Sequence, residues 1–208
     1  MQRLFVPLLL LSSTGVASAT AISVLNPGFE SVTLANPGDY SSTNIPGWVT
    51  NINSSTFRPQ TSDYPGGIPE GLNVAAVTNG DLTYQTLSAT LTADTTYTLL
   101  VDVGNRPGFF HCYTVSLSAG SAVLVSDSSL SPAAGTFLTT TLSYYAAPGN
   151  ADLGQALKIT LGDSGVSGQV NYDNVRLDAV TGPEPASFVS FGSGIAALFM
   201  FRRRVLMR

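Results

Sequence analysis

The sequence has few of the residues that usually carry enzyme chemistry or staple small exported domains. Its 208 residues include one cysteine, Cys112, and one histidine, His111. A single cysteine cannot form an internal disulfide, and a zinc site usually needs three or four His, Cys or carboxylate ligands. The two residues are adjacent, so on a strand their side chains project to opposite faces. We therefore expect neither a Cys–His catalytic pair nor a zinc centre, and we expect His111 to lie on a surface or loop.

Charged residues are also scarce, at 11% of the chain. Residues 21–180 contain four basic and twelve acidic residues, so this span carries a net charge of −8. Such a surface repels phosphate backbones, and we expect no nucleic-acid partner. The low charge and the abundance of Gly, Pro and hydroxyl residues favour a β-rich extracellular domain over a helical cytosolic enzyme.

Short segments of alternating hydrophobicity take the place of long helical patterns. In residues 96–103, for example, Tyr97, Leu99, Val101 and Val103 share one face. Similar segments are 21–25, 47–52, 73–77, 82–91, 113–117, 122–127, 135–145, 157–161 and 169–178. Gly-, Pro- and Asn-rich stretches separate them. The sequence therefore predicts an all-β domain over residues 22–180, with nine or ten strands in a sandwich or barrel.

The N-terminus has the order of features expected of an export signal. A basic residue, Arg3, precedes an apolar stretch of eight residues, 4–11, which is too short to span a bilayer. Small residues at 17–19 and 19–21 then offer two cleavage sites, after Ala19 or after Ala21. We interpret residues 1–21 as a signal peptide.

The C-terminal segment, 181–208, joins a linker to an apolar run and a cluster of arginines. The run, 186–201, would be ~24 Å long as a helix at ~1.5 Å per residue, whereas a hydrocarbon core is ~30 Å thick. It predicts a short, marginal transmembrane helix whose arginine-rich end stays in the cytoplasm. Together with the signal peptide, this places residues 22–180 outside the inner membrane.

The order of these parts resembles the PEP-CTERM sorting signal of Gram-negative bacteria. The resemblance rests on the Pro-Glu-Pro triplet, the weak apolar helix and the basic end, that is, on Pro183, Glu184, Pro185, Arg202, Arg203 and Arg204. It implies that an exosortase recognises and cleaves the tail. The protein would then insert only transiently into the inner membrane and pass to the cell surface or extracellular matrix. A stalk with a permanent stop-transfer anchor is the alternative.

The central domain resembles the galactose-binding-like jelly rolls of carbohydrate-binding modules. The matching residues are "NPGFE" at 26–30, "IPGW" at 45–48 and "YDNVRLD" at 172–178. The resemblance implies a jelly-roll β-sandwich, often with a structural Ca²⁺ near the first and last of these stretches.

Asp173 is the residue that draws attention in the last stretch. By alternation Asp173 would share a face with Val175 and Leu177, so either a bulge shifts the phase after Tyr172 or the carboxylate turns inward. A buried carboxylate needs a partner or a metal ion. With Glu30 as its partner, we predict a structural Ca²⁺ site at Glu30 and Asp173. A solvated bulge at Asp173 and a turn-capping Glu30 are the alternatives.

A sugar ligand would need aromatic rings for stacking and polar groups for its hydroxyls. The candidates that we name are Trp48, Tyr84, Arg106, Phe109 and Phe110, with Phe57 and Tyr64 as further aromatic residues. Trp48 could equally fill the core. The sequence thus predicts a secreted, non-catalytic matrix or biofilm protein that contacts exopolysaccharide or other glycans. The alternatives are an adhesive protein with protein partners and a small glycoside hydrolase.

Overall fold

The computed structural model describes residues 18–41, 44–165 and 167–182, in which Ala19–Val180 form one compact unit of β-strands. The strands are β1 (Ala19–Ile22), β2 (Val49–Thr50), β3 (Ser54–Phe57), β4 (Val74–Thr78), β5 (Leu82–Thr90), β6 (Thr95–Asn105), β7 (Tyr113–Ala119), β8 (Ala122–Asp127), β9 (Thr136–Ala146), β10 (Ala156–Asp163) and β11 (Gln169–Thr181).

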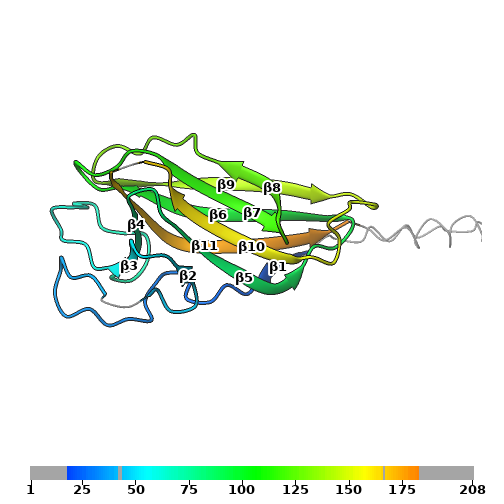
Figure 1. Ribbon diagram of the computed structural model, residues 1–208, viewed down its shortest axis with the longest axis horizontal. Coiled ribbons are helices and arrows are strands. Elements are labelled where there is room, and N and C mark those ends of the chain that lie inside the picture. Colours follow the sequence, from blue (N-terminus) through cyan, green and yellow to red (C-terminus); the bar gives the residue numbers. More distant parts are fainter. Residues whose placement is uncertain (1–17, 42–43, 166, 183–208) are drawn as a thin grey trace, which may run out of the picture. The chain divides into compact units, whose positions relative to one another are not determined.

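The strands form two sheets, whose strands overlap in the view of Figure 1. The six-stranded sheet has the order β3-β4-β11-β6-β9, and β1 pairs with β11 beside this path. The five-stranded sheet has the order β2-β5-β10-β7-β8. The described strand pairs run antiparallel, including β1 with β11, where Ala19 lies opposite Val180.

The core lies between the sheets and follows the predicted alternation. On β6, Tyr97, Leu99 and Val101 are buried in it, and Thr98 and Leu100 between them are partly exposed. β10 contributes Leu157 and Ile159 in the same way. Burial of apolar area stabilises such a core by about 25 cal/mol per Å². The period of two in the sequence therefore determines which face of each strand packs against the core.

The predicted all-β class and its two-sheet organisation are confirmed, whereas the jelly-roll connectivity stays a prediction. The sequence did not reveal β3, because "SSTF" has no alternation of apolar residues. None of the described residues forms a helix with the length and apolar character needed to cross a bilayer. The predicted helix at 186–201 and residues 1–17 of the predicted signal peptide lie outside the described residues.

β11 contains the phase shift that the sequence posed as a question. Val170 and Tyr172 point into the core, and so do Val175 and Leu177, so the alternation reverses between Tyr172 and Val175. Asn174 has a φ of 51° at this point, as in a bulge. Asp173 therefore lies on the outer face of the six-stranded sheet, with Gln169 and Asn171. We call these three residues the polar row.

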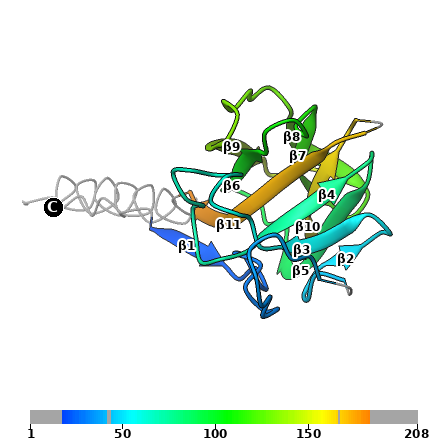
Figure 2. The same ribbon diagram turned by 90° about the vertical axis from the view of Figure 1, so that its left-hand side faces the viewer.

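Long connections cover this outer face at one end of the sandwich. The cyan segment between β3 and β4 lies at the left end of the molecule in Figure 1. Figure 2 looks onto that end. A small second cluster of buried apolar residues, Phe57, Val74 and Ala76, lies here, separate from the main core.

Candidate functional site

The polar row is buried although it lies outside the core. Gln169 is 4% exposed, and Asn171 and Asp173 are fully buried. The Asn171 side-chain oxygen accepts hydrogen bonds from the Tyr64 hydroxyl at 2.8 Å and from Gln169 Nε2 at 3.2 Å. Buried polar groups cost free energy unless they are paired. The row is therefore a built feature of this face.

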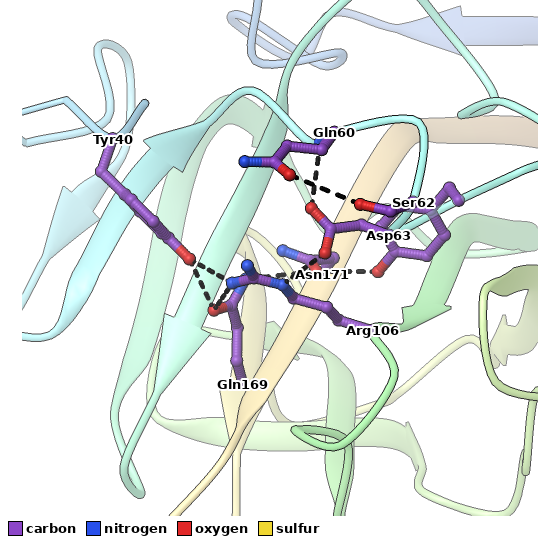
Figure 3. A network of polar contacts seen from close by, with 8 residues as sticks. Tyr40, Gln60, Ser62, Asp63, Arg106, Gln169 and Asn171 are labelled. Carbon is purple, nitrogen blue, oxygen red and sulfur yellow. Dashed lines mark hydrogen bonds and ion pairs between the residues drawn. The ribbon is translucent and has the colours of Figure 1, made fainter. Parts of the chain in front are cut away.

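Arg106, directly after β6, lies over the start of the polar row (Figure 3). Its Nε contacts Asp63 Oδ1 at 3.0 Å in an ion pair. Its Nη1 donates to the Tyr40 hydroxyl at 2.5 Å and to Gln169 Oε1 at 3.1 Å. The Tyr40 hydroxyl in turn donates to Gln169 Oε1 at 2.9 Å. Hydrogen bonds thus fix the Nε and Nη1 groups of the guanidinium.

Two aromatic rings contact the same guanidinium. Its central carbon lies 4.6 Å from the centroids of both Phe57 and Phe109, within the range of cation–π contact. Tyr40 stacks on Phe57 at 4.3 Å. Tyr40 and Phe109 keep 44% and 46% of their surface exposed. We call Tyr40, Phe57, Asp63, Arg106, Phe109 and Gln169 the Arg106 cluster.

Tight local turns bring the loop residues of the cluster into place. The Phe109 amide donates to the Arg106 carbonyl oxygen at 3.1 Å, and Gly108 between them has a φ of 79°. Pro107 followed by a left-handed glycine is typical of a type II turn, which returns Phe109 over Arg106. Asp63 is fixed by the Gln60 amide, which donates to Asp63 Oδ2 at 2.9 Å.

Two pockets are lined by residues of the cluster or by residues bonded to it, such as Gln60. One, of about 440 Å³, is lined in part by Gln60, Tyr64 and Ile68. The other, of about 390 Å³, is lined in part by Phe109 and Gln169. Burial, with the charge of Asp63, raises the pKa of Tyr64 well above its ordinary value, so this phenol stays protonated. The site combines aromatic walls, neutral amides and phenols, and one arginine–aspartate ion pair.

Glycine at position 104 makes room for the floor of this region. A Cβ atom there would lie 2.4 Å from Phe137 Cε1 and 2.9 Å from the Tyr64 hydroxyl oxygen. Tyr64 and Phe137 can therefore pack against each other, with ring centroids 4.5 Å apart.

The predicted metal ligands, Asp173 and Glu30, meet the same short segment of backbone. Asp173 Oδ2 accepts the Glu70 amide at 2.9 Å, and Glu30 Oε1 accepts the amides of Leu72 at 2.8 Å and Asn73 at 2.6 Å. Burial raises the pKa of Asp173 to about 8, with the charges of Glu70 and Asp102 acting in the same direction. Among the described residues, no three His, Cys, Asp or Glu side chains gather closely enough to enclose a metal ion.

The structure brings together only two of the five predicted ligand-binding residues, Arg106 and Phe109. Trp48 is 5% exposed and packs against Phe29 in the core, as the alternative interpretation held. Tyr84 lies on the five-stranded sheet, next to Lys158. Phe110 packs against the main core.

Tyr40, Asp63, Gln169 and Asn171 were missed as site residues. Gln169 and Asn171 could have been found, because polar residues at 169, 171 and 173 alternate with apolar ones, which is unusual for a strand that is covered on both faces. Tyr40 and Asp63 come from loops whose course no sequence pattern fixes. His111 is exposed as expected, and Cys112 is exposed too.

The predicted sorting residues, Pro183, Glu184, Pro185 and the arginines at 202–204, lie outside the described residues. They stay a prediction.

Comparison with known proteins supports the predicted likeness to carbohydrate-binding modules only at the level of fold. A family 61 module in complex with β-1,4-galactotriose is 15% identical, with a TM-score of 0.50, and the match covers 76% of this chain and 98% of that one. No curated protein matched the chain.

Higher similarity is found to cyclases from Fischerella sp. TAU. The Stig cyclase Fisc, in complex with (3Z)-3-(1-methyl-2-pyrrolidinylidene)-3H-indole, is 32% identical, with a TM-score of 0.72. The match covers 80% of this chain and 100% of that one. A cyclase structure with 4-(1H-indol-3-yl)butan-2-one is also 32% identical, with a TM-score of 0.71, covering 79% and 100% of the two chains.

These matches overturn the prediction of a non-catalytic matrix or biofilm protein that contacts glycans, together with its adhesive and glycosidase alternatives. The error arose because the fold motifs are shared with sugar-binding modules, whereas the site depends on loops that the sequence pattern does not place. A family model described as HpiC1-like, HpiC1 cyclase, matches residues 20–178. The chain therefore belongs to the HpiC1-like family of cyclases.

Proposed function

We propose that this chain is a cyclase that binds an indole-bearing substrate at the Arg106 cluster. The observation that carries the proposal is the pair of partly exposed rings, Tyr40 and Phe109, which both contact a fixed guanidinium, Tyr40 through its hydroxyl and Phe109 through its ring. A flat aromatic substrate can stack on such rings. Related cyclases of known structure hold indole compounds, which supports the same substrate class here.

The cluster also suits a ring closure that passes through a cation. In such a reaction a proton adds to the substrate, a carbon–carbon bond closes the ring and a proton leaves, so the product is an isomer of the substrate. Tyr40 is the proton donor that we propose, because its side chain is partly exposed and Arg106 Nη1, which donates to its oxygen, would stabilise the phenolate left behind. Its one O–H donates to Gln169 Oε1 and would turn to the substrate in this step. The rings that already flank one cation would stabilise positive charge on the substrate.

The experiment uses the full chain and an indole with an alkene-bearing chain at C3. We expect a product of unchanged mass and altered chromatographic retention. General acid catalysis is worth roughly 10²–10⁴-fold, so Tyr40→Phe should lower the rate by about 100-fold or more. Tyr145→Phe is the matched control, because Tyr145 is an exposed tyrosine on β9 whose hydroxyl donates to Asp94, in the turn before β6 and at the other end of that strand from Arg106.

Unchanged turnover by Tyr40→Phe would remove Tyr40 from its proposed role. Absence of turnover, together with absence of binding to 4-(1H-indol-3-yl)butan-2-one in calorimetry, would overturn the proposed function itself.

We further propose that a structural Ca²⁺ binds where the carboxylates of Glu30 and Asp173 meet the backbone of residues 70–73. Three features support it. Asp173 is a fully buried carboxyl that, within the described part of the chain, receives hydrogen bonds from just two backbone amides. Asn73 Oδ1 is buried without a hydrogen-bond partner, while its Nδ2 donates to Glu30 Oε2 at 3.0 Å. Carboxylate, amide and carbonyl oxygens are the ligands that Ca²⁺ takes, so two carboxylates with Asn73 fit the ion.

The Ca²⁺ proposal predicts a change in thermal stability. At a Ca²⁺ concentration about 100 times Kd, the ion should add about 2.7 kcal/mol, which raises Tm by roughly 5–10 °C for a domain of this size. Asp173→Asn should abolish the rise, and Asp178→Asn on the same strand should keep it. Equal Tm values in EDTA and in Ca²⁺ would contradict the proposal.

A further inference from the structure

We infer that Arg106 is the receptor for a carbonyl oxygen on the substrate's side chain. The inference rests on the proposed indole site and adds what the site recognises beyond the ring. It starts from the donors of the guanidinium. Arginine has five N–H groups; Nε uses one on Asp63, and Nη1 uses two on Tyr40 and Gln169. Among the described residues, Nη2 has no partner.

Contacts of the guanidinium with four neighbouring side chains hold the free Nη2 group in one orientation. Phe57 and Phe109 fix the plane of the guanidinium, and Asp63 and Gln169 fix its rotation within that plane. In Figure 3 no dashed line joins the remaining nitrogen of Arg106 to another of the side chains drawn. A donor that is held before the ligand arrives loses little conformational freedom on binding, which strengthens the contact.

The charge balance selects the kind of oxygen. Asp63 contacts Arg106 at 3.0 Å, and both side chains are mostly buried, at 15% and 17% exposure. The ion pair carries no net charge, so the site has little to attract a full anion. It still offers two strongly polarised N–H groups. A neutral acceptor with two lone pairs, a carbonyl oxygen, fits them.

The neighbouring rings set where this oxygen must be. Phe109 contacts the guanidinium with one face and keeps 46% of its surface exposed. An indole stacked on Phe109 or Tyr40 would therefore lie within a short chain length of Nη2. The substrate class that follows is an indole whose C3 chain carries a carbonyl group.

Two probes that differ in one oxygen test the inference. Calorimetry with the full chain would compare 4-(1H-indol-3-yl)butan-2-one with 3-butylindole, which lacks the carbonyl. A hydrogen bond to a charged donor is worth a factor of about ten or more in affinity. We expect wild type to bind the ketone about tenfold more tightly. In Arg106→Met the preference should vanish, and in Arg176→Met, an exposed arginine on β11, it should persist.

The outcomes separate this inference from the proposed function. Equal affinity of wild type for the two probes would overturn the role of Arg106 and leave the indole site standing. Binding of neither probe would overturn both. Arg106→Lys, which keeps the charge but not the planar fork, covers the case in which Arg106→Met does not fold; a full ketone preference in this variant would also overturn the inference.

Discussion

At the scale of single residues, the protonation state of the Asp127 carboxyl group affects how the loop after β8 is held. Its carboxylate accepts hydrogen bonds from the hydroxyls of Tyr113, Thr140 and Ser129. Burial opposes ionisation, but these hydrogen bonds outweigh it and lower the pKa of Asp127 to about 2. The Leu130 amide donates to the Tyr113 hydroxyl, so the same group of contacts fastens the chain after β8.

A carboxyl whose pKa is lower in the folded state contributes stability above its unfolded pKa, here near 3.8, and loses it as the pH falls toward 2. Thr140→Val removes one donor. We expect this variant to be about 1 kcal/mol less stable than wild type at pH 5.5, with the difference shrinking between pH 4 and pH 2. Denaturant midpoints measure it. Thr141→Val, an exposed neighbour, should show a small difference that is independent of pH.

At the scale of elements, β11 marks how far sequence reasoning reaches. The alternation of Val170 and Tyr172 predicted its buried face, and the change of phase at Asp173 was visible as a choice between a bulge and an inward carboxylate. The positive φ of Asn174 decides for the bulge. Backbone periodicity carries this information, so it can be predicted.

The Arg106 cluster could not be predicted in the same way. Its side chains come from positions 40, 57, 63, 106, 109 and 169, which the sheet order brings together. Arg106 and Phe109 were identified only by residue type. The partners that give them their chemistry, Tyr40 and Gln169, have no local signature, because their roles depend on contacts more than sixty residues apart.

At the scale of the whole molecule, we propose export, and the position of β1 bears on where the signal peptide would be cleaved. The predicted cleavage sites follow Ala19 or Ala21, and Ala19–Ile22 is β1, which pairs with Leu177–Val180 of β11. Removal of Thr20 and Ala21 would discard most of this pairing. The predicted exosortase processing near Pro183–Pro185 would fall beyond the last residue of β11, Thr181.

We therefore predict a mature protein that begins at Thr20. Intact-mass measurement on protein from its native host reads both ends at once, because it also reports cleavage or attachment near residue 183. A mature chain that begins at Ile22 would contradict the prediction. A chain that retains residues 183–208 would contradict the proposed sorting step without touching the cyclase assignment.

β11 supplies core residues on one face and the polar row on the other. A substitution in this strand can therefore impair both folding and the binding site. The connections around Tyr40, Asp63 and Phe109 carry no such double duty. Sequence changes that alter the product among relatives should therefore be concentrated in those connections. Variant libraries aimed at new substrates should change the connections and keep β11 constant.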